Sequence, residues 1–406
     1  MRILIIGAGG VGSAAVRIAV RRTFFDRLVI ADSDPARPQA LVDELQDPRL
    51  VAASVDASSA EAVTALVLEH GATHVLNAVD PRFVMPIFDG CFEAGATYLD
   101  MAMSLSAKHP EQPYEKTGVL LGQAQFDAAP QWEAAGRLAL VGIGVEPGLS
   151  DVFARHAEDE LFSSIDELGV RDGANLTVDG YGFAPSFSIW TTIEECLNPP
   201  VVFERDRGWF TTEPFSEPEV FHFPEGIGPV ECVNVEHEEV VLMPRWTRAR
   251  RVTFKYGLGE EFIDVLRTLH RLGLDSTEPL RVKDVSVSPR DVVAAALPDP
   301  ATLGDRMHGK TCAGVLVTGR GKDGAPRSVY LYHVVDNAWT MAEYTSQAVV
   351  WQTAVNPVIA LELLATGRWQ GSGVLGPEAF DARPFLDLLA ADAPAGYGSP
   401  WGMEER

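Results

Sequence analysis

The chain has 406 residues, of which 46% are hydrophobic and 22% charged, so a disordered chain or a fibrous repeat is excluded. Asp and Glu outnumber Lys and Arg by 57 to 33, and this net charge of −24 argues against a nucleic-acid binder or a membrane-surface binder. The four cysteines lie far apart without a C-x-x-C pair, which predicts a reducing, cytoplasmic location and argues against a disulfide scaffold and a cysteine-bound zinc.

An apolar strand, a glycine-rich turn and a helix open the chain. Residues 2–6 predict a strand covered on both faces, and residues 13–22 predict a helix. The turn between them has the pattern G-x-G-x-x-G, with a strand before it and a helix after it, as dinucleotide binding requires. In this motif the first glycine permits the turn, the second admits the pyrophosphate and the third lets the helix pack on the strand. The residues expected to bind the cofactor's phosphates are Gly7, Gly9, Gly10, Val11 and Gly12.

A second strand over residues 27–31 ends at Asp32, which follows Gly12 at the spacing usual for the acid that binds the adenosine ribose. A carboxylate at this position accepts hydrogen bonds from the ribose hydroxyls and repels a 2′-phosphate. The sequence therefore favours NAD as the cofactor, with NADP possible. The alternative interpretation is a tight strand-to-helix turn without a ligand.

Strands and helices continue to alternate up to residue 150. Further strands are predicted at 50–55, 74–79, 97–102 and 138–142, and helices at 59–70, 82–94 and 126–135. Such alternation predicts an α/β Rossmann domain with a doubly wound parallel sheet over residues 1–150. Ligands of such sheets lie beyond the C-terminal strand ends. Asp56 and Ala57 are accordingly expected beside the adenine, and Ala78 and Val79 under the middle of the cofactor, unless these residues only form ordinary loops.

The pattern changes after residue 150. Strands are predicted at 167–171, 201–204, 208–210, 220–223, 239–242 and 251–255, and a hairpin pairs 312–318 with 329–335. These are not alternating units, so residues 151–340 predict a second, α+β domain with a mixed, mostly antiparallel sheet. We expect this domain to bind the substrate and to form a homodimer, because two-fold pairing is the commonest form of oligomer.

Residues 341–406 are expected to return to the first domain. The stretch 341–365 is apolar and predicts a helix that Pro357 should kink or break. No apolar run without a charge is long enough to cross a membrane, so no membrane span is predicted.

Several short motifs together resemble the saccharopine dehydrogenase family over nearly the whole chain. They are the glycine loop and the segments 79–81 (VDP), 98–100 (YLD), 144–151 (GVEPGLSD), 191–200 (TTIEECLNPP), 234–239 (NVEHEE) and 254–259 (FKYGLG). The resemblance implies an NAD(P)-dependent enzyme that transfers a hydride at a C–N bond, through an imine, of an amino acid or a saccharopine-like secondary amine.

Within this resemblance, three residues are candidates for the chemistry. Glu146 lies in the turn after the sixth strand, where a carboxylate would stabilise a developing iminium, or would instead cap the next helix. Asp100 lies at the C-terminal end of a strand, at the same edge of the predicted sheet, and is a candidate contact for substrate or nicotinamide. His237 is a candidate base on the resemblance alone. The alternative is that it forms an ion pair at the surface with the acidic residues beside it in the sequence. No metal site is predicted.

An amino-dicarboxylate substrate is anionic and would need a cationic pocket in this acidic chain. Arg245 opens the most basic stretch, residues 245–255, and Arg171 and Arg82 follow strand ends, so these three are the candidate substrate anchors. The alternative for Arg245 is a solvated edge strand whose charges oppose aggregation.

Three functions remain open at this point. The first is a saccharopine-type reductase or dehydrogenase acting on a small amino-acid or polyamine-type molecule. The second is a lysine 6-dehydrogenase-like oxidative deaminase or a carboxynorspermidine-type polyamine enzyme. The third is a dinucleotide-binding sensor without turnover.

Overall fold

The computed structural model describes residues 1–406, and its first sheet has seven parallel strands. Their spatial order is β19-β6-β5-β4-β1-β2-β3, so the predicted Rossmann sheet is confirmed and one strand from the end of the chain joins it. The strands are β1 (Arg2–Ile6), β2 (Arg27–Asp32), β3 (Leu50–Ser54), β4 (His74–Asn77), β5 (Thr97–Asp100), β6 (Leu138–Leu140) and β19 (Gly373–Leu375).

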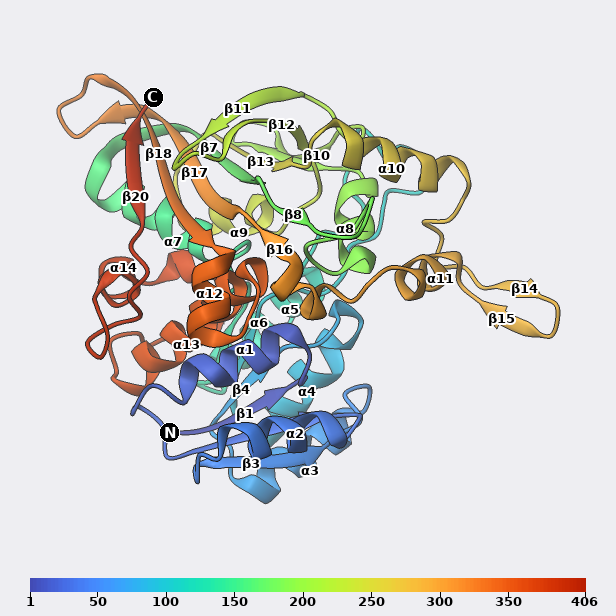
Figure 1. The fold of residues 1–406 in the computed structure, drawn as a ribbon. Coiled ribbons are helices and arrows are strands. Elements are labelled where there is room, and N and C mark those ends of the chain that lie inside the picture. The colour runs from blue at the N-terminus through green and yellow to red at the C-terminus, as the bar shows by residue number, and fades with distance from the viewer.

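Helices cover both faces of this sheet (Figure 1). In β1, Ile3 and Ile5 belong to one apolar core whereas Leu4 and Ile6 belong to another, because successive side chains of a strand point to opposite faces. A strand buried on both faces explains why this stretch is apolar without alternation. The helices of this half are α1 (Gly10–Ala19), α2 (Ala36–Leu45), α3 (Ala60–His70), η1 (Pro81–Phe83), α4 (Val84–Ala94), α5 (Gln123–Asp127) and α6 (Ala129–Ala134).

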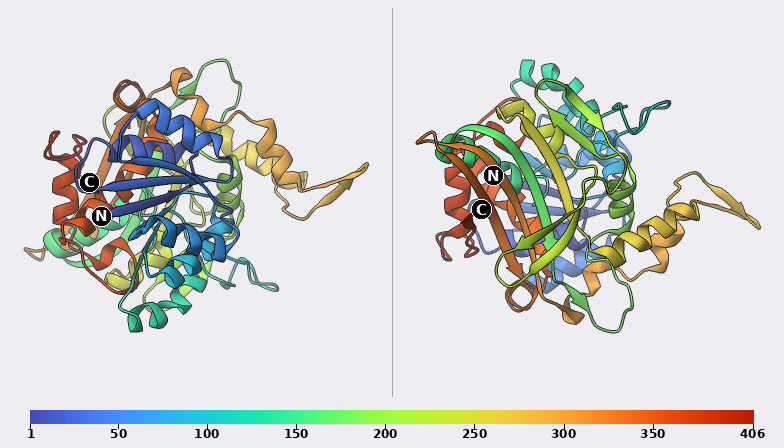
Figure 2. Two further views of the ribbon diagram at one scale, coloured as in Figure 1. Left: turned by 90° about the horizontal axis from the view of Figure 1, so that it is seen from below. Right: turned by 90° about the horizontal axis from the view of Figure 1, so that it is seen from above.

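The second sheet has nine strands and lies on the other side of a layer of helices (Figures 1 and 2). Only the pair β7 and β13 is parallel, so the predicted mixed, mostly antiparallel sheet is confirmed. The strands are β7 (Phe162–Ala174), β9 (Val201–Glu204), β10 (Gly208–Thr211), β11 (Glu219–Phe223), β12 (Gly228–Asn234), β13 (Arg251–Gly257), β17 (Lys310–Gly321), β18 (Pro326–Asp336) and β20 (Gly402–Glu405).

Two short ladders stand apart from this sheet. Strand β8 (Thr177–Val178) pairs with β16 (Met307–His308), and β14 (Leu280–Val282) pairs with β15 (Val285–Val287) in a hairpin that projects from the body of the molecule (Figure 1). The helices of this half are α7 (Leu149–His156), the π-helical turn η2 (Ala157–Leu161), α8 (Ile189–Leu197), α9 (Glu239–Trp246), α10 (Glu260–Arg271), α11 (Pro289–Ala296), η3 (Pro300–Thr302), η4 (Gly304–Arg306), α12 (Asn337–Tyr344), α13 (Ala348–Ala365), η5 (Pro377–Ala379) and α14 (Arg383–Ala390).

One sequence prediction is wrong, and a second is wrong in part. The stretch 239–242, predicted as a strand, begins helix α9, because a short apolar run that is buried on all sides has no periodicity that separates strand from helix. Pro357 does not break helix α13, which continues through it. A proline removes only one backbone hydrogen bond, and this helix is held by packing, since nearly all of its residues are buried.

Helix α13 is also the one helix that is long and apolar enough to cross a membrane by length and composition alone. Most of it is buried inside the fold, where it packs against α1, as a core helix does. After α13 the chain adds β19 beside β6 in the first sheet and then β20 beside β18 in the second.

Candidate active site

The glycine loop has the backbone that its motif requires. Gly7 has a φ of +110°, and a Cβ there would lie 2.4 Å from the carbonyl oxygen of Ala78. A Cβ at Gly12 would lie 1.9 Å from the carbonyl oxygen of Gly7, so both positions accept only glycine. A Cβ at Gly9, in contrast, would meet nothing within 4 Å. No side chain caps α1, whose first N–H groups are therefore free for an anion, and the loop fits the phosphates of a dinucleotide.

Asp32 lies beside this loop at the end of β2. Its Oδ2 accepts a hydrogen bond from the N–H of Ala8 at 2.8 Å, and its Oδ1 accepts one from Asp34 at 3.0 Å. Both contacts fix the carboxylate at the rim where a ribose would lie. Asp56 is exposed and accepts hydrogen bonds from the backbone and the hydroxyl of Ser58, whereas Ala57 is half-buried. Neither Asp56 nor Ala57 lines the cavity described next.

A main cavity of about 310 Å³ begins at the glycine loop and extends to the second sheet. Gly10, Val11, Ala78 and Val79 line it on the side of the first sheet. Its charged lining is entirely acidic, with six carboxylic residues and no Lys, Arg or His. These acidic residues are Asp80, Glu146, Asp172, Glu195, Glu238 and Asp299.

Of the three predicted catalytic residues, only Glu146 lines the main cavity. Its Oε1 is buried without a hydrogen-bond partner, and its carboxyl group lies close to that of Asp172. Burial and then the neighbouring carboxylates raise the pKa of Glu146 well above its ordinary value, and burial raises that of Asp172 to about 6. Such a pair holds a proton near neutral pH, as a general acid or base must.

Asp100 is buried below the main cavity rather than in it. Its Oδ1 accepts a hydrogen bond from the N–H of Gly142 at 2.7 Å, and its Oδ2 accepts one from the amide of Gln125 at 2.7 Å. These bonds tie the end of β5 to the loop after β6 and to helix α5. The expected contact with substrate or nicotinamide is thus not supported, because both carboxyl oxygens are used within the protein.

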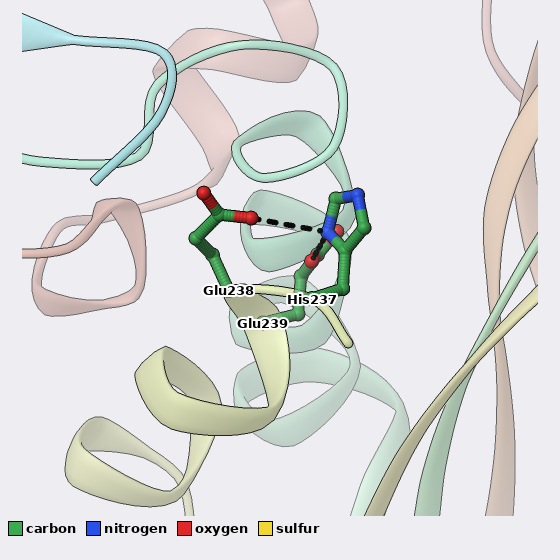
Figure 3. Close-up of side chains that lie close together, drawn as sticks. All are labelled: His237, Glu238 and Glu239. Atoms are coloured by element: carbon green, nitrogen blue, oxygen red, sulfur yellow. Dashed lines mark hydrogen bonds and ion pairs between the residues drawn. The ribbon is translucent and has the colours of Figure 1, made fainter. Parts of the chain in front are cut away.

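His237 is also buried and does not line the cavity. Its ring stacks on Phe254 at 3.8 Å between centroids, and its Nδ1 lies 2.5 Å from Glu239 and 3.4 Å from Glu238 (Figure 3). Burial lowers the pKa of His237. The three ligand atoms lie within 4.8 Å of one another, a spacing that a metal ion can also use, but a proton on Nδ1 satisfies the same contacts.

None of the three predicted arginine anchors lines the main cavity. Arg82 forms an ion pair with Asp80 at 2.8 Å, and the buried Arg171 is paired with Glu219. The guanidinium of Arg245 lies 3.7 Å from the centroid of the Phe126 ring. The structure therefore does not support the expected cationic pocket at this cavity: the arginines form ion pairs and packing contacts, and the charged residues of the lining are acidic.

The sequence interpretation missed most of the acidic lining. Asp172 stands in the long strand β7, Glu195 in α8 and Glu238 just before α9. The sequence around them gave no separate signal, because Asp172 follows Arg171, Glu195 follows Glu194 and Glu238 lies between His237 and Glu239.

The buried carboxyl groups predict an unusual dependence of stability on pH. Burial raises the pKa of Asp100 and Glu236 to about 7 and that of Glu239 to about 8. Between pH 6.5 and 8.5 the folded chain loses these protons, whereas the unfolded chain, whose carboxyl groups titrate near pH 4, has none left to lose. Stability should therefore fall as the pH rises.

We expect the Tm in calorimetry to be several degrees lower at pH 8.5 than at pH 6.5. Burial lowers the pKa of the half-buried His74 to about 4 and that of the buried His333 to about 3. These two groups oppose the trend only below about pH 6.5, where histidines of the unfolded chain take up protons. The variant Glu236→Gln should show a smaller decrease. A Tm that rises over this interval would contradict the assignment of buried, protonated carboxyl groups.

The parallel sheet, the glycine loop and the adjoining cavity define a nicotinamide-dinucleotide oxidoreductase. The saccharopine dehydrogenase NADP binding domain matches residues 3–140, and the saccharopine dehydrogenase C-terminal domain matches residues 144–392. The chain belongs to the saccharopine dehydrogenase family and is an NAD(P)-dependent enzyme that acts on a C–N bond. This confirms the resemblance seen in the sequence.

Similar proteins cover the chain from end to end. Carboxynorspermidine synthase of Vibrio alginolyticus is 30% identical over 100% of this chain and 97% of its own length. Carboxyaminopropylagmatine dehydrogenase of Synechocystis sp. is 28% identical over 98% of this chain and 96% of its own length. Saccharopine dehydrogenase (L-Glu forming) of Saccharomyces cerevisiae, solved in its apo form, shares the fold with a TM-score of 0.67 at 13% identity, over 100% of this chain and 99% of that one.

Proposed function

We propose that the protein catalyses NAD(P)-dependent oxidoreduction at a C–N bond of a carboxylated polyamine. The observation that carries the proposal is the charge of the main cavity, which has six carboxylic residues and no basic one. A polyamine carries several ammonium groups, and the lining carboxyl groups that are not already paired with an arginine can bind them. The names of two relatives, carboxynorspermidine synthase and carboxyaminopropylagmatine dehydrogenase, support the same substrate class.

The reaction balances without a further reactant. In the reductive direction an imine and NAD(P)H with one proton give a secondary amine and NAD(P)⁺, and oxidation is the reverse. When bound, the dinucleotide supplies or takes the hydride. The pair of Glu146 and Asp172 donates the proton to the imine nitrogen in reduction and accepts it from the amine in oxidation. Its remaining negative charge stabilises the iminium.

The residues that would hold the cofactor are those of the glycine loop and the first sheet. Gly9, Gly10 and Val11 present free backbone N–H groups to the phosphates, and Ala78 and Val79 line the cavity with small and apolar side chains. Asp32, which is hydrogen-bonded to the N–H of Ala8 in the loop, would bind the ribose. A carboxylate at this position favours NAD over NADP, although the matching family domain is described as NADP binding.

The variant Asp32→Ala tests this preference. Loss of the carboxylate should weaken NADH binding about ten-fold, because a hydrogen bond between a hydroxyl and a charged group is lost. It should leave NADPH binding equal or stronger, because the repulsion of the 2′-phosphate is removed. Fluorescence titration with both cofactors measures the ratio of the two Kd values. An unchanged ratio would show that Asp32 does not face the ribose.

The substrate class is tested by mixing the protein with each candidate amine and with NAD⁺ or NADP⁺. The absorbance of the reduced nicotinamide then measures the rate of oxidation. Carboxynorspermidine and carboxyaminopropylagmatine are the expected substrates, and saccharopine and lysine are the comparison. Faster turnover of saccharopine or lysine would contradict the polyamine proposal. Cofactor binding without turnover of any of the four would favour a sensor.

We infer three further properties. The chain is divided into a cofactor domain (1–150), a substrate and dimerisation domain (151–340) and a returning segment (341–406). A homodimer is supported by the projecting hairpin, where Leu280, Val282 and Val285 are more than half exposed. A cytoplasmic location is supported by four cysteines that are all free. Sedimentation analysis of the purified protein tests the dimer.

A further inference from the structure

A row of neighbouring side chains on the second sheet lines the main cavity. Tyr256 in β13 is paired with Asp172 in β7, and Asp172 is paired with Ala313 in β17. All three residues belong to the lining. Paired residues of adjacent strands point to the same face of a sheet, and the strands lie about 4.8 Å apart. Tyr256 is therefore the direct neighbour of Asp172, whose carboxyl group lies close to that of Glu146.

The hydroxyl group of Tyr256 has no partner in the protein. The hydroxyl groups of the buried Tyr98, Tyr330 and Tyr397 are hydrogen-bonded to other residues at 2.7 to 3.1 Å. Tyr256 is half-buried, its oxygen forms no such bond, and this oxygen is not one of the fully enclosed atoms that lack a partner. Since a tyrosine hydroxyl in the interior of a protein usually has a partner, that of Tyr256 is free for a ligand.

The surroundings of this hydroxyl show that it faces the cavity. Burial, and then the carboxyl groups of Glu195, Asp172 and Glu146, raise the pKa of Tyr256 well above its ordinary value. All three carboxylic residues line the main cavity. The phenol thus stays protonated at neutral pH, and it places an uncharged oxygen among acidic ones.

Two aromatic rings hold the ring of Tyr256 from behind. The ring centroid of Phe254 lies 5.3 Å from that of Tyr256 and the ring centroid of His237 lies 5.8 Å from it, and both rings are nearly perpendicular to it. His237 is itself fixed by its stacking on Phe254 and by its contact with Glu239. This packing restricts the ring of Tyr256 and so fixes the direction of its hydroxyl group.

We propose that Tyr256 is a further substrate contact, whose hydroxyl oxygen accepts a hydrogen bond from the nitrogen that exchanges a proton with Glu146 and Asp172. The inference rests on the proposed function. A protonated secondary amine has two N–H groups, and the carboxyl pair takes the proton of one. The other stays on the nitrogen while the hydride leaves and the iminium forms, so it needs an acceptor throughout. An uncharged oxygen orients this N–H without a negative charge that would hold the departing proton.

The variant Tyr256→Phe keeps the ring and its packing and removes only the hydroxyl. The Kd and the KM of carboxynorspermidine should both rise roughly ten-fold, because a hydrogen bond from a charged group is lost. The kcat should stay within about two-fold, because the same bond is kept in the transition state. The Kd of NADH and the Tm should not change. Tyr332→Phe is the matched control, since Tyr332 is half-buried in β18 and does not line the cavity, and it should change none of these values.

A substrate analogue identifies the atom that Tyr256 binds. Methylation of the secondary nitrogen of carboxynorspermidine leaves a single N–H on its protonated form, and the carboxyl pair takes this proton. The wild type should bind the methylated compound roughly ten-fold more weakly than carboxynorspermidine. In Tyr256→Phe the two Kd values should agree within about three-fold, because the contact that separates them is gone.

Calorimetric titration gives the four Kd values, and steady-state oxidation gives KM and kcat. Two outcomes would overturn the assignment: an unchanged affinity of Tyr256→Phe for carboxynorspermidine, or an equal preference of both proteins for the unmethylated compound. If the wild-type protein oxidises no carboxylated polyamine, the proposed function itself fails.

Discussion

A Gly9→Asp variant is expected to fold normally and to lose NAD(P)H binding. Gly9 has a φ of −75°, which any residue adopts, and a Cβ there points into open space. The new carboxylate would lie at the N-terminus of α1, where we expect the phosphates of the dinucleotide to bind. This carboxylate would occupy the volume that the phosphates need, and it would repel their negative charge.

Fluorescence titration should show an NADH Kd raised at least a hundred-fold, roughly the sum of the lost phosphate contacts and the added repulsion. The Tm should stay within a few degrees of the wild type. Gly12→Ala is the contrasting control, because its Cβ would lie 1.9 Å from the Gly7 carbonyl oxygen and should lower the Tm itself. Normal NADH affinity in a folded Gly9→Asp variant would place the dinucleotide elsewhere.

A Glu146→Gln variant is expected to lose most of the turnover while it keeps the cofactor. The amide has the same shape but cannot exchange a proton, so kcat should fall by about 10²–10³, the usual contribution of one general acid or base. The Kd for NADH should stay within about two-fold, since the phosphate-binding loop lies elsewhere. The pH dependence gives a second readout.

In the wild type, the pair of Glu146 and Asp172 must be protonated for reduction, so the reductive rate should fall as the pH rises through the pKa of the pair. Glu146→Gln should remove this decrease, whereas Glu378→Gln, which changes a carboxyl group outside the cavity, should keep it. A Glu146→Gln variant with wild-type kcat would show that the proton comes from another group.

The cofactor half could be predicted almost entirely from the sequence, because its determinants are local. The strand, the glycines, the helix and Asp32 fall within the first 32 residues, and their spacing alone sets the geometry of the loop. Glu146 was found for the same reason, since the turn around it is also a continuous motif.

The substrate half could not be predicted in this way. Asp172, Glu195 and Glu238 belong to three separate elements and meet only when the second sheet, α8 and the start of α9 pack around the cavity. The basic run that begins at Arg245 was a more visible signal in the sequence, but Arg245 lies on Phe126. Charge along the chain therefore did not predict the acidic lining of the main cavity, because only long-range packing decides which charges face it.

The end of the chain contributes an edge strand to each of the two sheets. Strand β19 extends the first sheet next to β6, and about thirty residues later β20 extends the second sheet next to β18. Residues 373–405 therefore connect the two sheets, because one of their strands pairs with each sheet. A protein shortened before Gly373 would therefore lose a border strand in both sheets at once.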